Sequence, residues 1–120
     1  MEHIELGKKG ESIAKEFLEK KGMIFYAMNW RYDRYEVDLI MRSGEFLVFV
    51  EVKTRSSEEY GSPEEAVRYD KRRNLIKAAH LFLVTSDLDL EPRFDIVAVI
   101  EKKNAPSKVI HFEEAFVPFA

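Results

Sequence analysis

The sequence contains no cysteine, so neither a disulfide framework nor a metal site with thiolate ligands is possible. Long apolar segments are also absent: the longest unbroken hydrophobic run covers residues 23–28, far too few to cross a bilayer. Residues 1–11 are polar and charged and contain no apolar core of a signal peptide. We therefore expect a cytoplasmic protein in a reducing compartment, with no membrane association.

Internal repeats, low-complexity tracts and linkers are missing as well, which predicts one domain over residues 1–120. A composition of 46% hydrophobic and 34% charged residues is typical of a globular protein. The net charge of −3 does not by itself indicate a nucleic-acid partner. However, most of the 19 Lys and Arg residues lie within residues 1–80, several of them between Arg68 and Lys77. A solvated helix face is the commoner meaning of such a run.

Hydrophobic periodicity predicts two helices and five strands. In chain order these are a helix over 5–21, strands over 23–30, 36–41 and 46–53, a helix over 63–84, and strands over 93–100 and 108–112. Gly22 stands at the expected C-terminal cap of the first helix. Ser62, Pro63 and Glu65 form the N-cap, first position and capping box of the second, after a polar loop over 54–62. This order predicts an α/β fold with a mixed sheet, in which a meander is followed by a crossover through the second helix.

Two charged residues interrupt the apolar strand "FLVFVEVK". Glu51 and Lys53 point to one face of the sheet, roughly 6.5 Å apart along the strand. If the preceding hairpin has a loop of two or four residues, Asp38 faces Phe49 and Glu36 faces Glu51, so the acids and Lys53 share a face. A three-residue loop would turn one strand over and separate them.

Each predicted helix also carries one charged residue on its apolar stripe. Glu11 lies three residues before Ala14, and Lys71 lies four residues before Leu75. Because neither charge suits a buried stripe, both helices are expected to direct a charged side chain toward the polar cluster on the sheet.

Carboxylates at close range repel one another unless a cation binds between them. Oxygen ligands without His or Cys favour Mg²⁺ or Mn²⁺, and the backbone carbonyl of Val52 is a further candidate ligand beside Asp38 and Glu51. Such an ion activates water for attack on a phosphodiester, and Lys53 can stabilise the transition-state charge. The alternative is structural: Glu51 and Lys53 form an ion pair on a solvated sheet face.

The pattern "VDLI" followed after a hairpin by "FVEVKTR" resembles the PD-(D/E)XK nuclease superfamily. More narrowly, the chain is similar to the uncharacterised bacterial YraN-type family, relatives of the archaeal Holliday-junction resolvases. The stretches "GKKGESIAKEFLEKKG", "NWR", "YGSPEEAVRYDKRRNLIKAAHLFL" and "RFDIVAVI" extend the resemblance over nearly the whole chain. It implies a restriction-endonuclease-like αβββαβ core with a mixed sheet flanked by helices.

The resemblance also implies roles for individual residues. Asp38 and Glu51 match the metal ligands, and Lys53 matches the catalytic lysine. Glu11 matches the acid of the first helix, and with the other three it is expected to be catalytic. Four basic residues are expected to bind nucleic-acid phosphates: Arg55, Arg68, Lys71 and Arg72.

Three functions follow from these expectations. The first is a Mg²⁺- or Mn²⁺-dependent endonuclease acting on DNA, with RNA left open, and on junctions as a homodimer. The second is a nucleic-acid-binding or assembly module whose metal site is slow or needs a partner. The third is a structural domain with an ion-paired sheet.

Residues outside the cluster have simpler interpretations. His3, His80 and His111 show no ligand spacing and are expected to be surface or packing residues. Arg93 and Asp95 alternate with apolar neighbours, which predicts an ion pair that supports the sheet.

Overall fold

The computed structural model describes residues 2–56 and 69–117, with side chains for residues 9–56 and 71–117. The elements in chain order are α1 (Glu2–Lys20), β1 (Ile24–Tyr32), β2 (Tyr35–Ser43), β3 (Phe46–Ser56), α2 (Tyr69–Ser86), β4 (Glu91–Lys102) and β5 (Ala105–Phe116). For the described residues, the predicted order of helix, three strands, helix and two strands is confirmed. Neither described helix is long and apolar enough to span a membrane.

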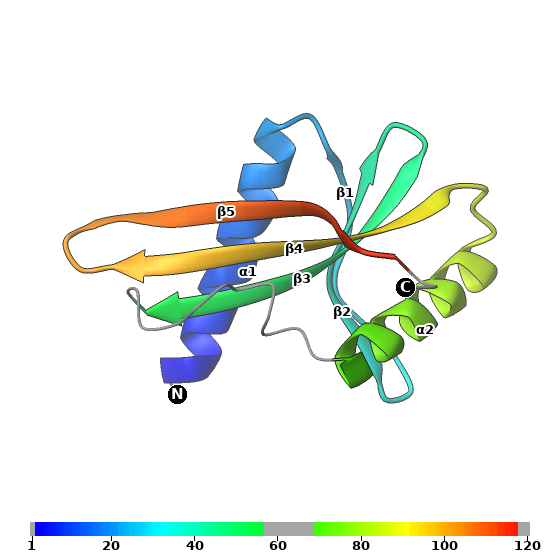
Figure 1. The fold of residues 1–120 in the computed structure, drawn as a ribbon, viewed down its shortest axis with the longest axis horizontal. Coiled ribbons are helices and arrows are strands. Elements are labelled where there is room, and N and C mark those ends of the chain that lie inside the picture. Colours follow the sequence, from blue (N-terminus) through cyan, green and yellow to red (C-terminus); the bar gives the residue numbers. More distant parts are fainter. Residues whose placement is uncertain (1, 57–68, 118–120) are drawn as a thin grey trace.

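The five strands form one sheet in the order β1-β2-β3-β4-β5 (Figure 1). All neighbouring strands are antiparallel except β3 and β4, which are parallel from Phe46↔Glu91 to Ser56↔Glu101. A parallel pair needs a long crossover connection, and α2 lies in that connection. The predicted α/β mixed sheet is therefore confirmed, and the arrangement is compatible with a restriction-endonuclease-like core.

The two helices pack against opposite faces of the sheet. Neighbouring side chains of a strand point to these two faces in turn, so each strand contributes to both cores. On one face, Val48 of β3 packs in a buried cluster with Leu18 of α1. On the other face, Phe49 packs in a second buried cluster with Leu75 of α2. The charged residues predicted to gather on β2 and β3 thus lie on a sheet that has a hydrophobic core on each face.

The β2–β3 hairpin differs in register from the prediction. Ser43 pairs with Phe46 across a two-residue turn, in which Gly44 has a φ of 62°. Glycine adopts this left-handed backbone without steric cost. The two-residue turn therefore comprises residues 44–45, one residue later than the 43–44 of the expected register, and each such step changes the pairing by two positions. The expected alignment of Asp38 with Phe49 is therefore wrong by two positions, since Leu39 pairs with Val50. An error of two leaves every side chain on its predicted face.

Most element boundaries differ from the prediction by a few residues. Residues 54–56 continue β3 and are not loop, because they pair with residues 99–101 of β4. Strand β5 is longer than the expected 108–112, since it remains paired with β4 as far as Phe116. Helix α1 ends at Lys20, and Gly22 has a φ of 98°, which confirms the predicted C-terminal cap. The predicted start of the second helix at residues 62–65 lies outside the described residues.

Candidate functional site

The site lies where β2 and β3 stop pairing. Their register runs from Ser43↔Phe46 to Leu39↔Val50, and the next charged residue of β2, Asp38, bonds to β3 through its side chain. The Val52 N–H donates to Asp38 Oδ2 at 2.8 Å. In a strand, the N–H and C=O of one residue point to the same edge. The Val52 carbonyl therefore faces the same gap as Asp38, as expected for a candidate metal ligand.

Glu51 is a buried acid between two lysines. Its residue is 5% exposed, and its Oε2 lies 2.9 Å from Lys71 Nζ and 3.4 Å from Lys53 Nζ. Lys53 comes from the same strand, whereas Lys71 reaches the cluster from α2. The convergence of β3 and α2 expected from the sequence is therefore present in the structure, and two ammonium groups offset the cost of burying this carboxylate.

Asp38 is much less well compensated. Burial raises its pKa from 3.8 to about 7, and the negative charges of Glu51 and Glu11 act in the same direction. The Val52 N–H and the Lys71 ammonium oppose this rise without cancelling it. Like charges at close range favour retention of a proton, and a bound cation would remove that preference.

Helix α1 brings Glu11 to the cluster through a close contact with β3. Gly10 is buried, and a Cβ atom at this position would lie 2.2 Å from Thr54 Oγ1. Any larger residue here would require the Thr54 side chain to turn away or the helix to move off the strand, beside Lys53. The sequence prediction placed Glu11 on the inward stripe of the helix but did not recognise Gly10, whose only signal is a small residue directly before the acid.

A cavity of about 210 Å³ opens over the carboxylates between β2, β3 and α2. It is lined by Arg34, Glu36, Asp38, Glu51, Lys71, Asn74 and Leu75. Glu36, which the hairpin prediction placed near the cluster, is exposed here and pairs with Arg31. Arg34 and Asn74 were not identified from the sequence. The cavity gives a ligand access to both candidate metal-binding side chains.

The basic residues predicted to bind phosphates are scattered. Arg55 Nη1 donates to the Thr54 carbonyl at 3.0 Å, and the Arg72 guanidinium lies 5.3 Å from the centre of the Phe116 ring. Neither lines the carboxylate cavity, whereas Lys71 does. Arg68 lies outside the described residues.

A second polar cluster surrounds Asp95 on β4. Asp95 is 0% exposed and accepts hydrogen bonds from Arg93 Nε at 3.0 Å, Arg93 Nη2 at 2.8 Å and the Glu114 N–H at 3.1 Å. The predicted ion pair is therefore confirmed. His111 Nε2 lies 2.7 Å from Asp95 Oδ2, and His111 Nδ1 lies 2.8 Å from Lys21 Nζ. His111 thus has specific polar partners, beyond the surface or packing role expected for it.

The donors at the first cluster fit a hard cation, although they are few. Among the described residues, no group of three or more His, Cys, Asp or Glu side chains is arranged to hold a metal ion. The available donors are the Asp38 and Glu51 carboxylates and the Val52 carbonyl. Mg²⁺ is commonly bound by one or two carboxylates and completes its shell with water and substrate oxygens. The raised pKa of Asp38 is what such a site would show without its cation.

Comparisons with known proteins agree with the family that the sequence motifs indicate. Residues 10–99 match the uncharacterised protein family UPF0102. The chain is 47% identical over 118 residues to a UPF0102 protein of Flavobacterium psychrophilum, with 98% of each chain covered. It is 40% identical over 117 residues to one of Bacteroides thetaiotaomicron, covering 98% of this chain and 96% of the relative. The chain therefore belongs to the uncharacterised protein family UPF0102.

Proposed function

We propose that this protein is a cytoplasmic, Mg²⁺- or Mn²⁺-dependent endonuclease of the PD-(D/E)XK superfamily that hydrolyses phosphodiester bonds in DNA. The observation that carries the proposal is the meeting of Asp38, Glu51 and Lys53 where the β2–β3 ladder ends, with the Val52 backbone turned toward Asp38. Acid, acid and lysine on one sheet face, beside an accessible cavity, match the residues that this chemistry needs.

The metal would be held by Asp38, Glu51 and the Val52 carbonyl. The Val52 N–H fixes Asp38 Oδ2, so the carboxylate is oriented before any ligand binds and its other oxygen remains for the cation. When bound, the cation supplies Lewis-acid polarisation of the phosphoryl oxygen and lowers the pKa of water. The Asp38 carboxyl group must lose its proton before it can bind the cation.

Lys53 and Glu11 assist from either side of the carboxylates. The Lys53 side chain is 15% exposed and its Nζ lies 3.4 Å from Glu51 Oε2. A phosphate bound at the proposed metal would therefore lie beside this positive charge. That charge stabilises the extra negative charge of the transition state and orients the attacking water. Glu11, directed to the site by α1, is suited to position a water molecule by accepting its hydrogen bond.

The proposed substrate includes branched DNA, the substrate of the junction resolvases that the chain resembles. Symmetric cutting of two strands of a four-way junction requires two active sites related by a two-fold axis. A homodimer is therefore part of the proposal for that substrate.

The experiment is cleavage of end-labelled four-way-junction, flap and linear DNA, and of matching RNA, with Mg²⁺ or Mn²⁺. We expect Asp38→Asn, Glu51→Gln and Lys53→Met each to lower the cleavage rate at least about 100-fold. Asp89→Asn, at an exposed position away from the site, is the matched control and should cleave like the natural protein. Equal cleavage by the Asp38→Asn and Asp89→Asn proteins would refute the proposal.

A second candidate is a nucleic-acid-binding or assembly module with a slow or partner-dependent metal site. The two lysines on Glu51 favour it, because they already compensate this carboxylate without a metal. The net charge of −3 also favours a partner that supplies further binding surface. Binding of DNA or RNA with no cleavage of any substrate would support this candidate over the nuclease.

A further inference from the structure

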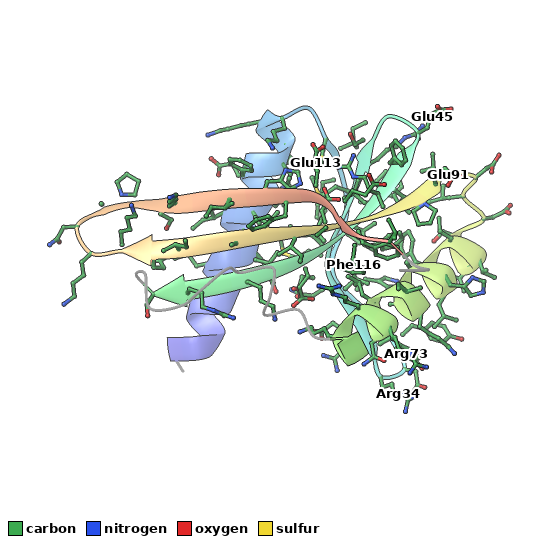
Figure 2. All side chains as sticks on the ribbon, in the orientation of Figure 1. Arg34, Glu45, Arg73, Glu91, Glu113 and Phe116 are labelled. Carbon is green, nitrogen blue, oxygen red and sulfur yellow. The ribbon has the colours of Figure 1, made fainter. Side chains whose placement is uncertain are left out.

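A second cavity, of about 290 Å³, lies next to the carboxylate cavity. Its lining is Arg34, Tyr35, Arg73, Asn74 and Lys77. Arg34 and Asn74 line both cavities, so the two form one continuous depression between the tip of the β1–β2 hairpin and α2. We call the second part the hairpin–helix groove. Figure 2 shows Arg34 and Arg73 close together at that end of the molecule.

The charge changes sign along this depression. The carboxylate cavity contains three acids, whereas the described residues that line the hairpin–helix groove include three basic side chains and none that is acidic. Arg73 and Lys77 are four residues apart on α2 and therefore lie on one face of the helix, about 6 Å apart along its axis. Arg34 faces them from the hairpin. Three positive charges along one depression create a positive potential that attracts a polyanion.

Tyr35 orients Arg34, the basic residue of the β1–β2 hairpin. The Arg34 guanidinium lies 5.3 Å from the centre of this ring, and its Nη2 donates to Tyr35 Oη at 3.2 Å. Tyr35 is half-buried and packs against the core cluster shared with α2. The guanidinium is thereby held toward the groove, and a planar guanidinium is the group best suited to bind phosphate oxygens in pairs.

The arrangement favours an extended ligand. The two cavities, of about 210 and 290 Å³, adjoin each other and share Arg34 and Asn74, so the depression is longer than either cavity alone. A shallow depression with cations at one end and candidate metal ligands at the other suits a chain of phosphates that runs past the reacting centre.

We propose that the hairpin–helix groove binds the phosphate backbone of one nucleic-acid strand and leads it to the Asp38–Glu51 carboxylates. Arg34, Arg73 and Lys77 contact phosphates on one side of the scissile bond, and Asn74 marks the passage between groove and active site. The inference rests on the proposed nuclease function for its scissile bond, and it assigns binding to residues other than Arg55, Arg68 and Arg72.

The test is fluorescence anisotropy with a short fluorescein-labelled single strand, as DNA and as RNA of the same sequence, in EDTA so that no cleavage occurs. The variant is Arg34→Ala with Lys77→Ala. The matched control is Lys103→Ala with Lys108→Ala, which removes the same charge from exposed positions of the β4–β5 hairpin, at the far end of the sheet in Figure 1. Circular dichroism confirms that both proteins fold.

Each phosphate contact contributes about 0.7 to the logarithmic salt slope of single-strand binding. Loss of two contacts should lower that slope by about 1.4 and weaken binding about 25-fold at 0.1 M salt. The control should change binding less than about twofold at the same salt. Equal losses in both variants, or no loss in the groove variant, would overturn the proposal.

The outcomes also separate this inference from the nuclease proposal. If metal-dependent cleavage persists while the groove variant binds like the natural protein, the inference fails and the nuclease stands. If binding depends on the groove but no substrate is cut, the nuclease fails and the groove stands. Tighter binding of the DNA or of the RNA strand identifies which nucleic acid the groove accepts.

Discussion

Replacing Asp38 by Asn should stabilise the metal-free protein at alkaline pH. Burial, together with the charges of Glu51 and Glu11, raises the pKa of Asp38 from 3.8 to about 7. One pKa unit corresponds to about 1.36 kcal/mol, so ionising Asp38 above pH 7 destabilises the fold by about 4 kcal/mol. Asn keeps an oxygen for the hydrogen bond from the Val52 N–H and carries no charge. The variant should therefore recover much of that free energy.

The sign of the pH dependence follows from the raised pKa. Between about pH 4 and about pH 7 the native state holds the Asp38 proton and the unfolded state does not. The contribution of Asp38 to the free energy of unfolding therefore falls as the pH rises through this window. At about pH 4 the variant and the natural protein should be nearly equal, and at about pH 8 the variant should be more stable by about 1–4 kcal/mol.

Urea unfolding in EDTA at these two pH values measures the difference. Asp89→Asn, at an exposed position, is the control and should stay within about 0.5 kcal/mol of the natural protein at both. Added Mg²⁺ should narrow or remove the difference at the higher pH, since a ligand at 100 times its Kd stabilises the natural protein by about 2.7 kcal/mol. If Asp38→Asn is no more stable than the natural protein at about pH 8, Asp38 ionises without strain and the reasoning is wrong.

Three further changes test other contacts. Gly10→Ala should lower the free energy of unfolding in urea by about 1–3 kcal/mol, because the new Cβ meets Thr54. Adding Thr54→Ala to this variant should recover part of the loss, whereas strictly additive losses would contradict the contact. Burial raises the pKa of Asp95, but hydrogen bonds, first from His111, outweigh it and hold the pKa below its usual value. The ionised Asp95 therefore stabilises the fold above about pH 4, and this stabilisation is lost in acid. Asp95→Asn should lower the free energy of unfolding in urea by about 3 kcal/mol at pH 7. An unchanged free energy of unfolding would count against a compensated buried charge. Lys71→Met removes a charge that lowers the pKa of Asp38, so a carbon-detected NMR titration of that carboxyl should shift to higher pH; an unchanged titration would separate Lys71 from the site.

The convergence of Asp38, Glu51 and Lys53 could be predicted because it depends only on the alternation of side chains along strands. The hairpin register was wrong by two positions, yet alternation repeats every two residues, so the same side chains still share a face. Glu11 and Lys71 were found in the same way, from charges placed on apolar helical stripes. Local periodicity therefore carried most of the candidate site.

The groove could not be predicted because it depends on how distant elements meet. Nothing near Arg34 in the sequence shows that the β1–β2 hairpin approaches α2, some forty residues later in the chain. The same holds for His111, whose bond to Asp95 requires the register of β5 against β4, including an irregularity between Phe94 and Ile96. A single sequence records the pattern of each strand but not the partner that it will face.

The charge count of the cluster bears on the choice between a metal site and an ion-paired sheet. Three carboxylates, of Glu11, Asp38 and Glu51, influence one another there, and two ammonium groups, of Lys53 and Lys71, compensate them. In an ion-paired sheet with balanced charge, the neighbouring cations would favour ionised acids. Here burial first, and then the charge of Glu51, raises the pKa of Asp38 to about 7, at the residue that accepts a hydrogen bond from the Val52 N–H and lines the cavity. On the proposed function, a divalent cation would add positive charge at that place, so stabilisation by Mg²⁺ should grow as the pH rises through 7.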